Sequence, residues 1–209
     1  MVPVLRQNNE KIDITGEGLK LVMTALANNA PPQIKIRPGA LVRIVKNQKG
    51  NYSITQLPEV EGAFVAMNPH DGAIRALVGG FDFNKNKFNH VTQAWRQPGS
   101  SFKPFIYSAA LEKGFTQSTV VNDAPLFFDA SVTGSQAWEP KNYDGKFEGQ
   151  MPLHQALAKS KNMVSIRVLQ SVGVHYAQDW ITRFGFEADK HPAYLTMALG
   201  AGSVTPMQM

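Results

Sequence analysis

The order of the sequence patterns predicts an α+β protein. Short β-branched runs separated by turn signals dominate residues 30–80, whereas apolar residues at helical spacing prevail after residue 100. Strands gathered in one part of a chain and helices in another favour an antiparallel sheet with helices. Hydrophobic residues make up 43% of the chain and charged residues 18%, a balance that supports a packed core and argues against disorder.

Composition excludes several classes of site. The chain has no cysteine, so it has no thiol nucleophile and no zinc site built on Cys. Its five histidines lack metal-ligand spacing, and we expect neither a metal nor a cofactor. Residues 1–60 hold 8 Lys and Arg against 4 Asp and Glu, but no basic run or aromatic interleaving accompanies this surplus. It is typical of a solvated face, and we expect no nucleic-acid partner.

The front of the chain predicts a small β-rich module. Residues 17–29 have apolar positions at helical spacing and predict a short helix that ends at Pro31-Pro32. Residues 34–45 are β-branched around a turn at 37–40, and residues 51–57 predict a further strand. Residues 30–58 therefore predict part of a small β-barrel or sheet.

A second region follows the boundary marked by Pro58 and Gly62. Residues 63–80 contain two apolar runs on either side of a Pro-His-Asp-Gly turn, which predicts a hairpin of mostly buried strands. Residues 81–95 are polar and rich in Asn, and predict a loop. We therefore predict two domains, 1–60 and 61–209.

The rest of the chain is predicted to be mainly helical. Residues 100–113 predict a helix that Gly114 ends, and residues 121–150 predict an irregular connection. Further helices are predicted over 152–158, 162–172 and 175–184. Thr205-Pro206 is a helix-start signal placed only four residues before the chain stops, so we expect an internal fragment of a longer protein.

Ser100 and Lys103 form a Ser-x-x-Lys pattern. Residues three apart share one face of a helix, which would bring the Ser100 hydroxyl within reach of the Lys103 amine. Serine needs a base to become a good nucleophile, and a lysine with a lowered pKa can be that base. Pro104 is tolerated only in a first helical turn, so Ser100 is predicted near a helix start, where a free N–H can help to bind an oxyanion.

A second pattern, Ser-x-Asn, is formed by Ser160 and Asn162 between two predicted helices. Such a turn can carry a proton-relaying hydroxyl and a substrate-holding amide into a site. Each pattern alone is weak evidence: with 11 Ser and 14 Lys, chance placement gives about 0.7 Ser-x-x-Lys matches in this chain. A capped surface helix and an ordinary helix–helix turn remain the alternatives.

Longer runs around these patterns resemble the class A penicillin-binding proteins. Residues 64–80 resemble the opening strands of that family's transpeptidase domain, and residues 96–105 resemble its first motif. Residues 138–142, 159–162 and 198–208 resemble later segments in the same order. Residues 30–58 resemble part of the OB-like β domain of the Gram-negative members.

The resemblance implies a fold and a set of roles. The chain would hold part of the OB-like domain followed by the first part of the transpeptidase, which cross-links peptidoglycan stem peptides and is acylated by β-lactams. Ser100 would be the nucleophile, Lys103 its base, Ser160 a proton relay and Asn162 a substrate-positioning group. Trp138 and Asn142 would line the substrate site, with a buried anchoring role as the alternative.

One departure limits that expectation. The family's third motif, Lys-Thr-Gly or Lys-Ser-Gly, is absent, as are its N-terminal glycosyltransferase domain and membrane anchor. We expect the parent protein to sit at the inner membrane with periplasmic catalytic domains, and this fragment alone to be acylated slowly or not at all. A β-lactamase or D,D-carboxypeptidase shares both motifs and is an alternative. A non-catalytic β-domain interaction module is another. Under the leading interpretation, the OB-like domain is also a candidate binding site for a regulatory protein.

Overall fold

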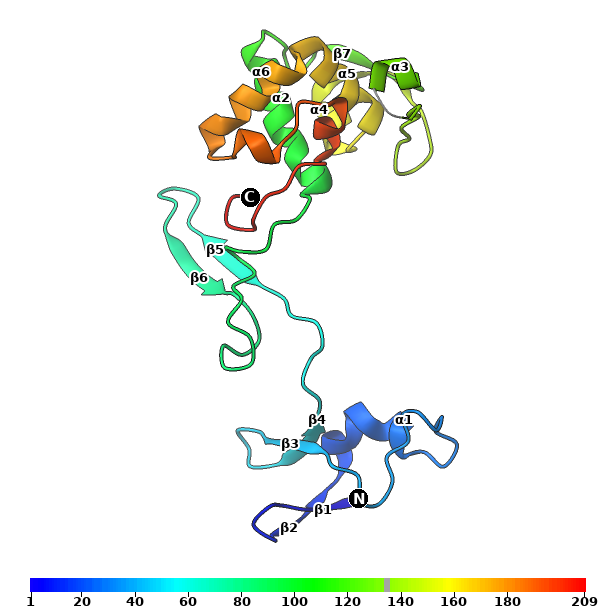
Figure 1. The fold of residues 1–209 in the computed structure, drawn as a ribbon, viewed down its shortest axis with the longest axis vertical. Coiled ribbons are helices and arrows are strands. Elements are labelled where there is room, and N and C mark those ends of the chain that lie inside the picture. The colour runs from blue at the N-terminus through cyan, green and yellow to red at the C-terminus, as the bar shows by residue number, and fades with distance from the viewer. Residues whose placement is uncertain (134–135) are drawn as a thin grey trace. The chain divides into compact units, whose positions relative to one another are not determined.

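A computed structural model of the protein describes residues 1–133 and 136–209, without the side chains of residues 132 and 133. The described chain forms two compact units, Met1–Glu61 and Gly62–Met209. Its strands are short and antiparallel and its helices lie mainly in the second unit, so the predicted α+β class is confirmed (Figure 1). Among the described residues, none of the helices has the length and apolar character needed to cross a bilayer.

The first unit contains two hairpins joined by a helical segment. The hairpins pair β1 (Val2–Leu5) with β2 (Lys11–Ile14) and β3 (Arg43–Lys46) with β4 (Tyr52–Thr55). Between them lie a 3-10 helix, Gly16–Val22, and a single α-helical turn, α1 (Met23–Leu26). The predicted helix and the strand over 51–57 are therefore present in shorter form, whereas the β1–β2 hairpin was not predicted from the sequence.

The prediction of strand structure at the beginning of 34–45 is wrong. The carbonyl of Pro31 accepts hydrogen bonds from the N–H groups of Ile34 and Lys35, and the N–H of Ile36 bonds to Ala25. These donors are used in a turn and in a contact with α1, so they cannot join a β-ladder. The predicted turn at 37–40 is present, with Gly39 at φ +89°.

Close packing in the first unit depends on Gly18. A Cβ atom added there would lie 2.3 Å from the carbonyl oxygen of Tyr52, so only glycine lets the 3-10 helix approach β4 this closely. Ile14 and Ile54, which are 1% and 5% exposed, are the most deeply buried hydrophobic side chains of this unit.

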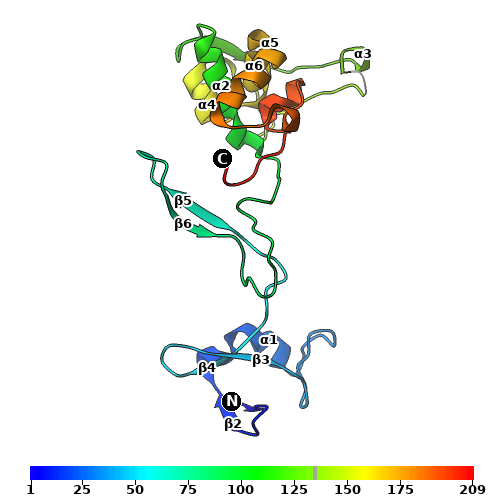
Figure 2. The same ribbon diagram turned by 60° about the vertical axis from the view of Figure 1, so that its left-hand side comes forward.

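The second unit begins with the predicted hairpin. β5 (Phe64–Met67) pairs with β6 (Ile74–Val78) (Figure 2). The pairing has a register shift between Ala66 and Met67. The expectation that these strands are buried is wrong: every residue of β6 is exposed, and Phe64 is 59% exposed. In the described chain the sheet has only these two strands, and a two-stranded ribbon cannot cover its own faces.

Four helices form the core of the second unit. They are α2 (Lys103–Glu112), α4 (Leu153–Ala158), α5 (Asn162–Val172) and α6 (Val174–Ile181). The α5 helix contacts the other three (Figure 1), and seven of its eleven residues are buried, as expected for a central core helix. The helices predicted over 100–113, 152–158, 162–172 and 175–184 are thus confirmed, apart from 3-10 turns at Gly99–Phe102 and Thr182–Phe184.

The connection between α2 and α4 is more ordered than predicted. β7 (Val120–Asp123) pairs with β8 (Gly149–Pro152), and α3 (Ala130–Thr133) is a single helical turn. The described residues between these elements are irregular, apart from a single bridge between Phe128 and Trp138. The pairing brings Asp123 opposite Gly149 and so gathers both ends of the connection beside α5.

Candidate active site

The turn that carries Ser100 is a 3-10 helix, Gly99–Phe102, which we call the nucleophile turn. Gly99 has φ +58°, a left-handed conformation that glycine adopts without strain. The turn leads directly into α2, where Pro104 lies in the first turn as predicted. Phe102 is fully buried and fixes the turn to the core.

Backbone contacts with a distant segment hold the nucleophile turn. The N–H of Gly99 donates to the carbonyl of Gly200 over 3.3 Å, and Arg96 and Val204 exchange two hydrogen bonds of 2.9 Å. A Cβ atom at Gly200 would lie 2.1 Å from the carbonyl oxygen of Gly99. Glycine is therefore required at position 200 for the two backbones to meet, and this explains the position of the run 198–204 beside Ser100.

Lys103 is buried against the turn between α4 and α5. Its Nζ donates to the carbonyl oxygen of Ser160 at 2.7 Å, to Ser160 Oγ at 3.0 Å and to Asn162 Oδ1 at 2.7 Å. The side chain is 1% exposed. Burial lowers the pKa of the Lys103 amine from its usual 10.5 to about 8, because the charged form is poorly solvated there.

Residues 159–162, which we call the Ser160 turn, connect α4 to α5. Ser160 has φ +53°, one of two non-glycine residues of the described chain in the left-handed region. Such a conformation costs about 1–3 kcal/mol and persists only where the surroundings impose it. Asn162 is the first residue of α5, and its Nδ2 donates to the carbonyl of Lys141 at 2.8 Å.

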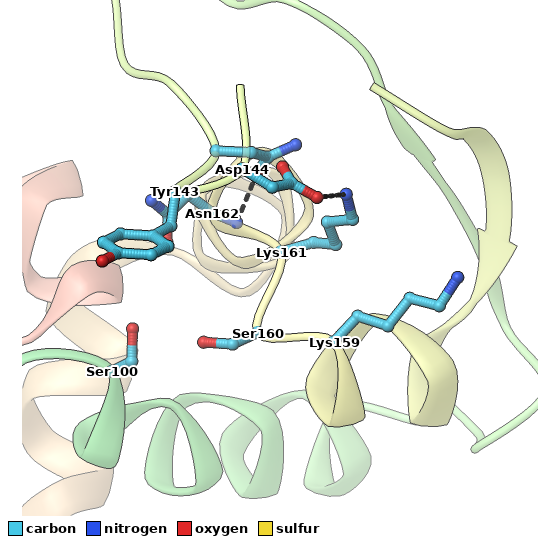
Figure 3. Close-up of a pocket in the computed structure, with 8 residues that line it drawn as sticks. Ser100, Tyr143, Asp144, Lys159, Ser160, Lys161 and Asn162 are labelled. Atoms are coloured by element: carbon cyan, nitrogen blue, oxygen red, sulfur yellow. Dashed lines mark hydrogen bonds and ion pairs between the residues drawn. The ribbon is translucent and has the colours of Figure 1, made fainter. Parts of the chain in front are cut away.

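Both turns open onto one pocket of about 320 Å³. Figure 3 shows the hydroxyls of Ser100 and Ser160 in this hollow, with the Ser160 side chain pointing toward Ser100. Within the described residues no hydrogen bond holds the Ser100 hydroxyl, and the Lys103 amine bonds to the Ser160 turn instead. The pocket is lined by Ser100, Asn142, Tyr143, Asp144, Lys159, Ser160, Lys161 and Asn162.

The two residues predicted to line a substrate site lie in different environments. Trp138 is not among the pocket residues; its ring stacks on Phe128 with centroids 5.3 Å apart. Asn142 borders the pocket but is 4% exposed, and its amide is fully engaged by the protein. The structure thus brings together Ser100, Lys103, Ser160 and Asn162, and places Trp138 elsewhere.

Comparisons with known proteins agree with this arrangement. The family model described as penicillin binding protein transpeptidase domain matches residues 62–209, and the one described as penicillin-binding protein OB-like domain matches residues 1–60. The chain belongs to the penicillin-binding protein family.

Curated relatives point to the class A, Gram-negative type of penicillin-binding protein. Penicillin-binding protein 1A of Neisseria meningitidis serogroup A is 49% identical over 199 residues, which are 95% of this chain and 25% of that protein. Penicillin-binding protein 1A of Pseudomonas aeruginosa is 42% identical over 214 residues, covering 100% of this chain and 26% of that protein. The chain thus spans about a quarter of the length of the curated relatives it matches.

Solved structures of penicillin-binding proteins share the fold. The crystal structure of penicillin-binding protein 1A from Haemophilus influenzae matches with a TM-score of 0.81 and 36% identity, over 99% of this chain and 29% of that chain. The PonA1 protein from Mycobacterium tuberculosis, solved in complex with penicillin V, matches with a TM-score of 0.59 and 26% identity, over 72% of this chain and 43% of that chain. The predicted family and fold class are confirmed.

Sequence reasoning missed the charged cluster next to the Ser160 turn. Lys161 is 2% exposed and pairs with Asp123, Asp144 and Glu148. The carboxylates are 38, 17 and 13 positions before the lysine in the chain, so no local spacing links them. The only available signal was a lysine placed between the two residues of a Ser-x-Asn pattern.

Proposed function

We propose that this chain carries the acylating centre of a D,D-transpeptidase, with Ser100 as nucleophile and Lys103 as its base. The observation that carries the proposal is the buried Lys103 amine, bonded to Ser160 and Asn162 next to a pocket that the Ser100 hydroxyl shares. A nucleophile, a base and a group that orients the base are the parts that acyl transfer requires.

The lowered pKa of Lys103 suits the role of base. With a pKa of about 8, roughly a tenth of the amine is neutral at pH 7, against about one part in 3,000 for an unperturbed lysine. A neutral amine can accept the Ser100 proton, whereas an ammonium cannot. Ser160 Oγ, 3.0 Å from the amine, is placed to pass that proton on.

The proposed reaction proceeds in two stages. Ser100 Oγ attacks the carbonyl carbon of a D-Ala–D-Ala bond while its proton passes to Lys103. The C–N bond then breaks, and Ser160 relays the proton to the departing amine, leaving an ester on Ser100. The amine of a second stem peptide attacks this ester, forms the cross-link and restores the Ser100 hydroxyl. In a β-lactam, the ring amide takes the place of the peptide bond.

The roles of the remaining predicted residues follow from their contacts. Asn162 presents Oδ1 to Lys103 and lies at the pocket, so we assign it both to orienting the base and to positioning the substrate. Asn142 supports the pocket rather than binding substrate, since its amide is engaged. Trp138, which stacks on Phe128, takes the alternative role of an anchor for its loop.

The wider assignment is also a proposal. It comprises peptidoglycan stem peptides and β-lactams as ligands, residues 61–209 as the N-terminal part of the transpeptidase domain, and residues 1–60 as linker and partial OB-like domain. It places the parent protein at the inner membrane with its catalytic domains in the periplasm. A regulatory protein would bind at the OB-like unit. The relatives named penicillin-binding protein 1A support this assignment.

Labelling with a fluorescent penicillin tests the nucleophile. In the full-length protein, Ser100→Ala is expected to abolish covalent labelling. Ser101→Ala, at the exposed neighbouring serine of the same turn, should label like the unmodified protein. Persistent labelling of Ser100→Ala would show that another residue is the nucleophile.

Product analysis distinguishes the three candidate activities. With stem peptide as substrate, cross-linked dimer supports the transpeptidase, whereas release of D-Ala alone supports a carboxypeptidase. Rapid hydrolysis of the lactam supports a β-lactamase.

A further inference from the structure

Lys161 has an unusual environment for a lysine that borders a pocket. Its side chain is 2% exposed, and its Nζ lies 2.9 Å from Glu148, 3.0 Å from Asp144 and 3.5 Å from Asp123. Figure 3 shows the side chain turned away from Ser100 and Ser160, toward Asp144. Burial by itself would lower the pKa of Lys161, but the hydrogen bonds to Glu148 and Asp144 and the charge of Asp123 raise it overall, so the amine stays charged.

Asp123 joins this ion cluster to a second contact. Its side chain is fully buried, where it accepts hydrogen bonds from Asn142 Nδ2 at 2.7 Å and from the N–H of Glu148 at 3.0 Å. Asn142 Oδ1 in turn accepts from the N–H of Asn162 at 2.8 Å. Asp123 is therefore linked to the Ser160 turn twice, through the Lys161 side chain and through Asn142.

These two links hold the two residues that directly follow a strained backbone position. Ser160 has φ +53°, and the next two residues are the ones that Asp123 reaches. Lys161, at the N-cap of α5, makes no side-chain cap, and Asn142 instead supplies an acceptor to the first free N–H groups of that helix. In this left-handed conformation the Ser160 carbonyl accepts a hydrogen bond from Lys103 Nζ at 2.7 Å.

We propose that Lys161 is a positioning residue for acyl transfer: together with Asp123 and Asn142 it fixes the Ser160 turn so that Ser160 and Asn162 face Lys103. We call these three residues the anchor cluster. The inference rests on the proposed function, because it assumes that Lys103 is the base. It adds a role for the residue between the two members of the Ser-x-Asn pattern and reassigns Asn142 from substrate contact to support.

The choice of a charged side chain follows from the burial of Asp123. A carboxylate removed from water needs a counter-charge as well as hydrogen bonds, and Lys161 supplies the charge. An apolar residue at position 161 would leave Asp123 buried with hydrogen bonds but without its cation. The turn would then shift to let water reach the carboxylate, and a displacement of about 1 Å at a catalytic group can cost on the order of 100-fold in rate.

The test uses acylation of the full-length protein by a fluorescent penicillin. Lys161→Met is expected to lower the second-order acylation rate by on the order of 100-fold, whereas Lys161→Arg, which keeps charge and donors, should restore most of it. Lys146→Met is the matched control, because it makes the same substitution at an exposed lysine of the neighbouring loop. It should acylate like the unmodified protein.

A second readout separates positioning from stability alone. The Ser160 turn covers Lys103, and only uncharged groups of the described chain bond to that amine. If the turn moves, water reaches the amine, the pKa of Lys103 rises toward its usual value, and the acid limb of the acylation rate shifts to higher pH. A residue that only stabilised the fold would leave this limb in place, so an unchanged limb in Lys161→Met would overturn the proposal.

Asp123→Asn keeps the proposal testable if Lys161→Met does not fold. It removes the charge and keeps one acceptor, for Asn142. The N–H of Glu148 loses its acceptor, but Glu148 is exposed and can bond to water. The variant should therefore fold and show the same shift with a smaller loss of rate. Wild-type kinetics in this variant would also overturn the proposal. Ser100→Ala in the same series separates a failure of the proposed function from a failure of the role of Lys161. If Ser100→Ala still labels, the proposed function is wrong. If it is inert while Lys161→Met acylates normally, only the role of Lys161 is wrong.

Discussion

The nucleophile turn and the Ser160 turn border the same pocket but are held in different ways. Gly99 meets Gly200 backbone to backbone, with no side chain between them. The Ser160 turn depends on side chains, chiefly the buried pair of Lys161 and Asp123 and the amide of Asn142. The nucleophile turn should therefore be sensitive to added side-chain volume, and the Ser160 turn to the loss of a side-chain charge.

Lys103 lies on the helix that follows the nucleophile turn and bonds to the Ser160 turn. Because it connects the two turns, its loss should have the largest effect on acylation. Lys103→Met is expected to reduce acylation by at least about 1,000-fold, because general-base catalysis alone contributes roughly 10²–10⁴-fold. The measurement is the acylation rate by stopped-flow fluorescence. A reduction of less than about tenfold would show that another group takes the Ser100 proton.

Lys103→Met also tests the lowered pKa, because the unfolding free energies of the wild type and of this variant should depend differently on pH. Because the folded-state pKa of Lys103 is depressed to about 8, charging this amine costs the folded state. That cost is fully present below pH 8 and disappears as the pH rises from about 8 to the unfolded value near 10.5. Unfolding free energy of the wild type should therefore gain about 3 kcal/mol relative to Lys103→Met across this window. Parallel curves for the two proteins would contradict the lowered pKa.

The volume sensitivity of the nucleophile turn is tested by Gly200→Ala. The new Cβ would lie 2.1 Å from the carbonyl oxygen of Gly99, so the two segments must separate and Ser100 must move. We expect acylation to fall on the order of 100-fold. Gly114→Ala is the control: it has a similar positive φ but nothing within 4 Å of the added atom, and it should cost only about 1–3 kcal/mol of stability. Equal acylation in the two variants would refute the contact.

How much of this site could be predicted from the sequence depends on the distance between partners along the chain. Ser100 with Lys103 and Ser160 with Asn162 are local patterns, and the surrounding runs identified the family. The hydrogen bonds from Lys103 to Ser160 and Asn162 join residues more than 50 positions apart, so only the resemblance could suggest them.

The fold was predictable to a similar extent. Helix α5 was evident from its apolar positions, but β7 and β8 were not, because Gly149–Pro152 carries glycine and proline and lacks the alternation typical of a strand. The exposure of β6 was also unpredictable, since a continuous apolar run is typical of a covered strand and gives no indication of whether other strands pack on it.

The smallest expected effect concerns the region behind the nucleophile turn. His191 is 1% exposed, stacks on Phe102, and has no hydrogen-bond partner for either ring nitrogen within the described chain. Replacing it with an apolar residue removes an unsatisfied buried group, so His191→Leu should raise the unfolding free energy by about 1 kcal/mol. Thermal denaturation provides the measurement, with His175→Leu at an exposed position of α6 as the control. Destabilisation would indicate that the imidazole has a polar partner.

The left-handed backbone of Ser160 also restricts how this position can vary during evolution. Glycine and asparagine adopt such a φ most readily, but neither carries a hydroxyl. Threonine keeps the hydroxyl, yet its branched Cβ is poorly suited to this conformation. Each single replacement therefore sacrifices either the hydroxyl of the proposed proton relay or the backbone geometry. Lineages carrying this chain should have few neutral routes away from serine at position 160, even where the rest of the Ser160 turn is free to diverge.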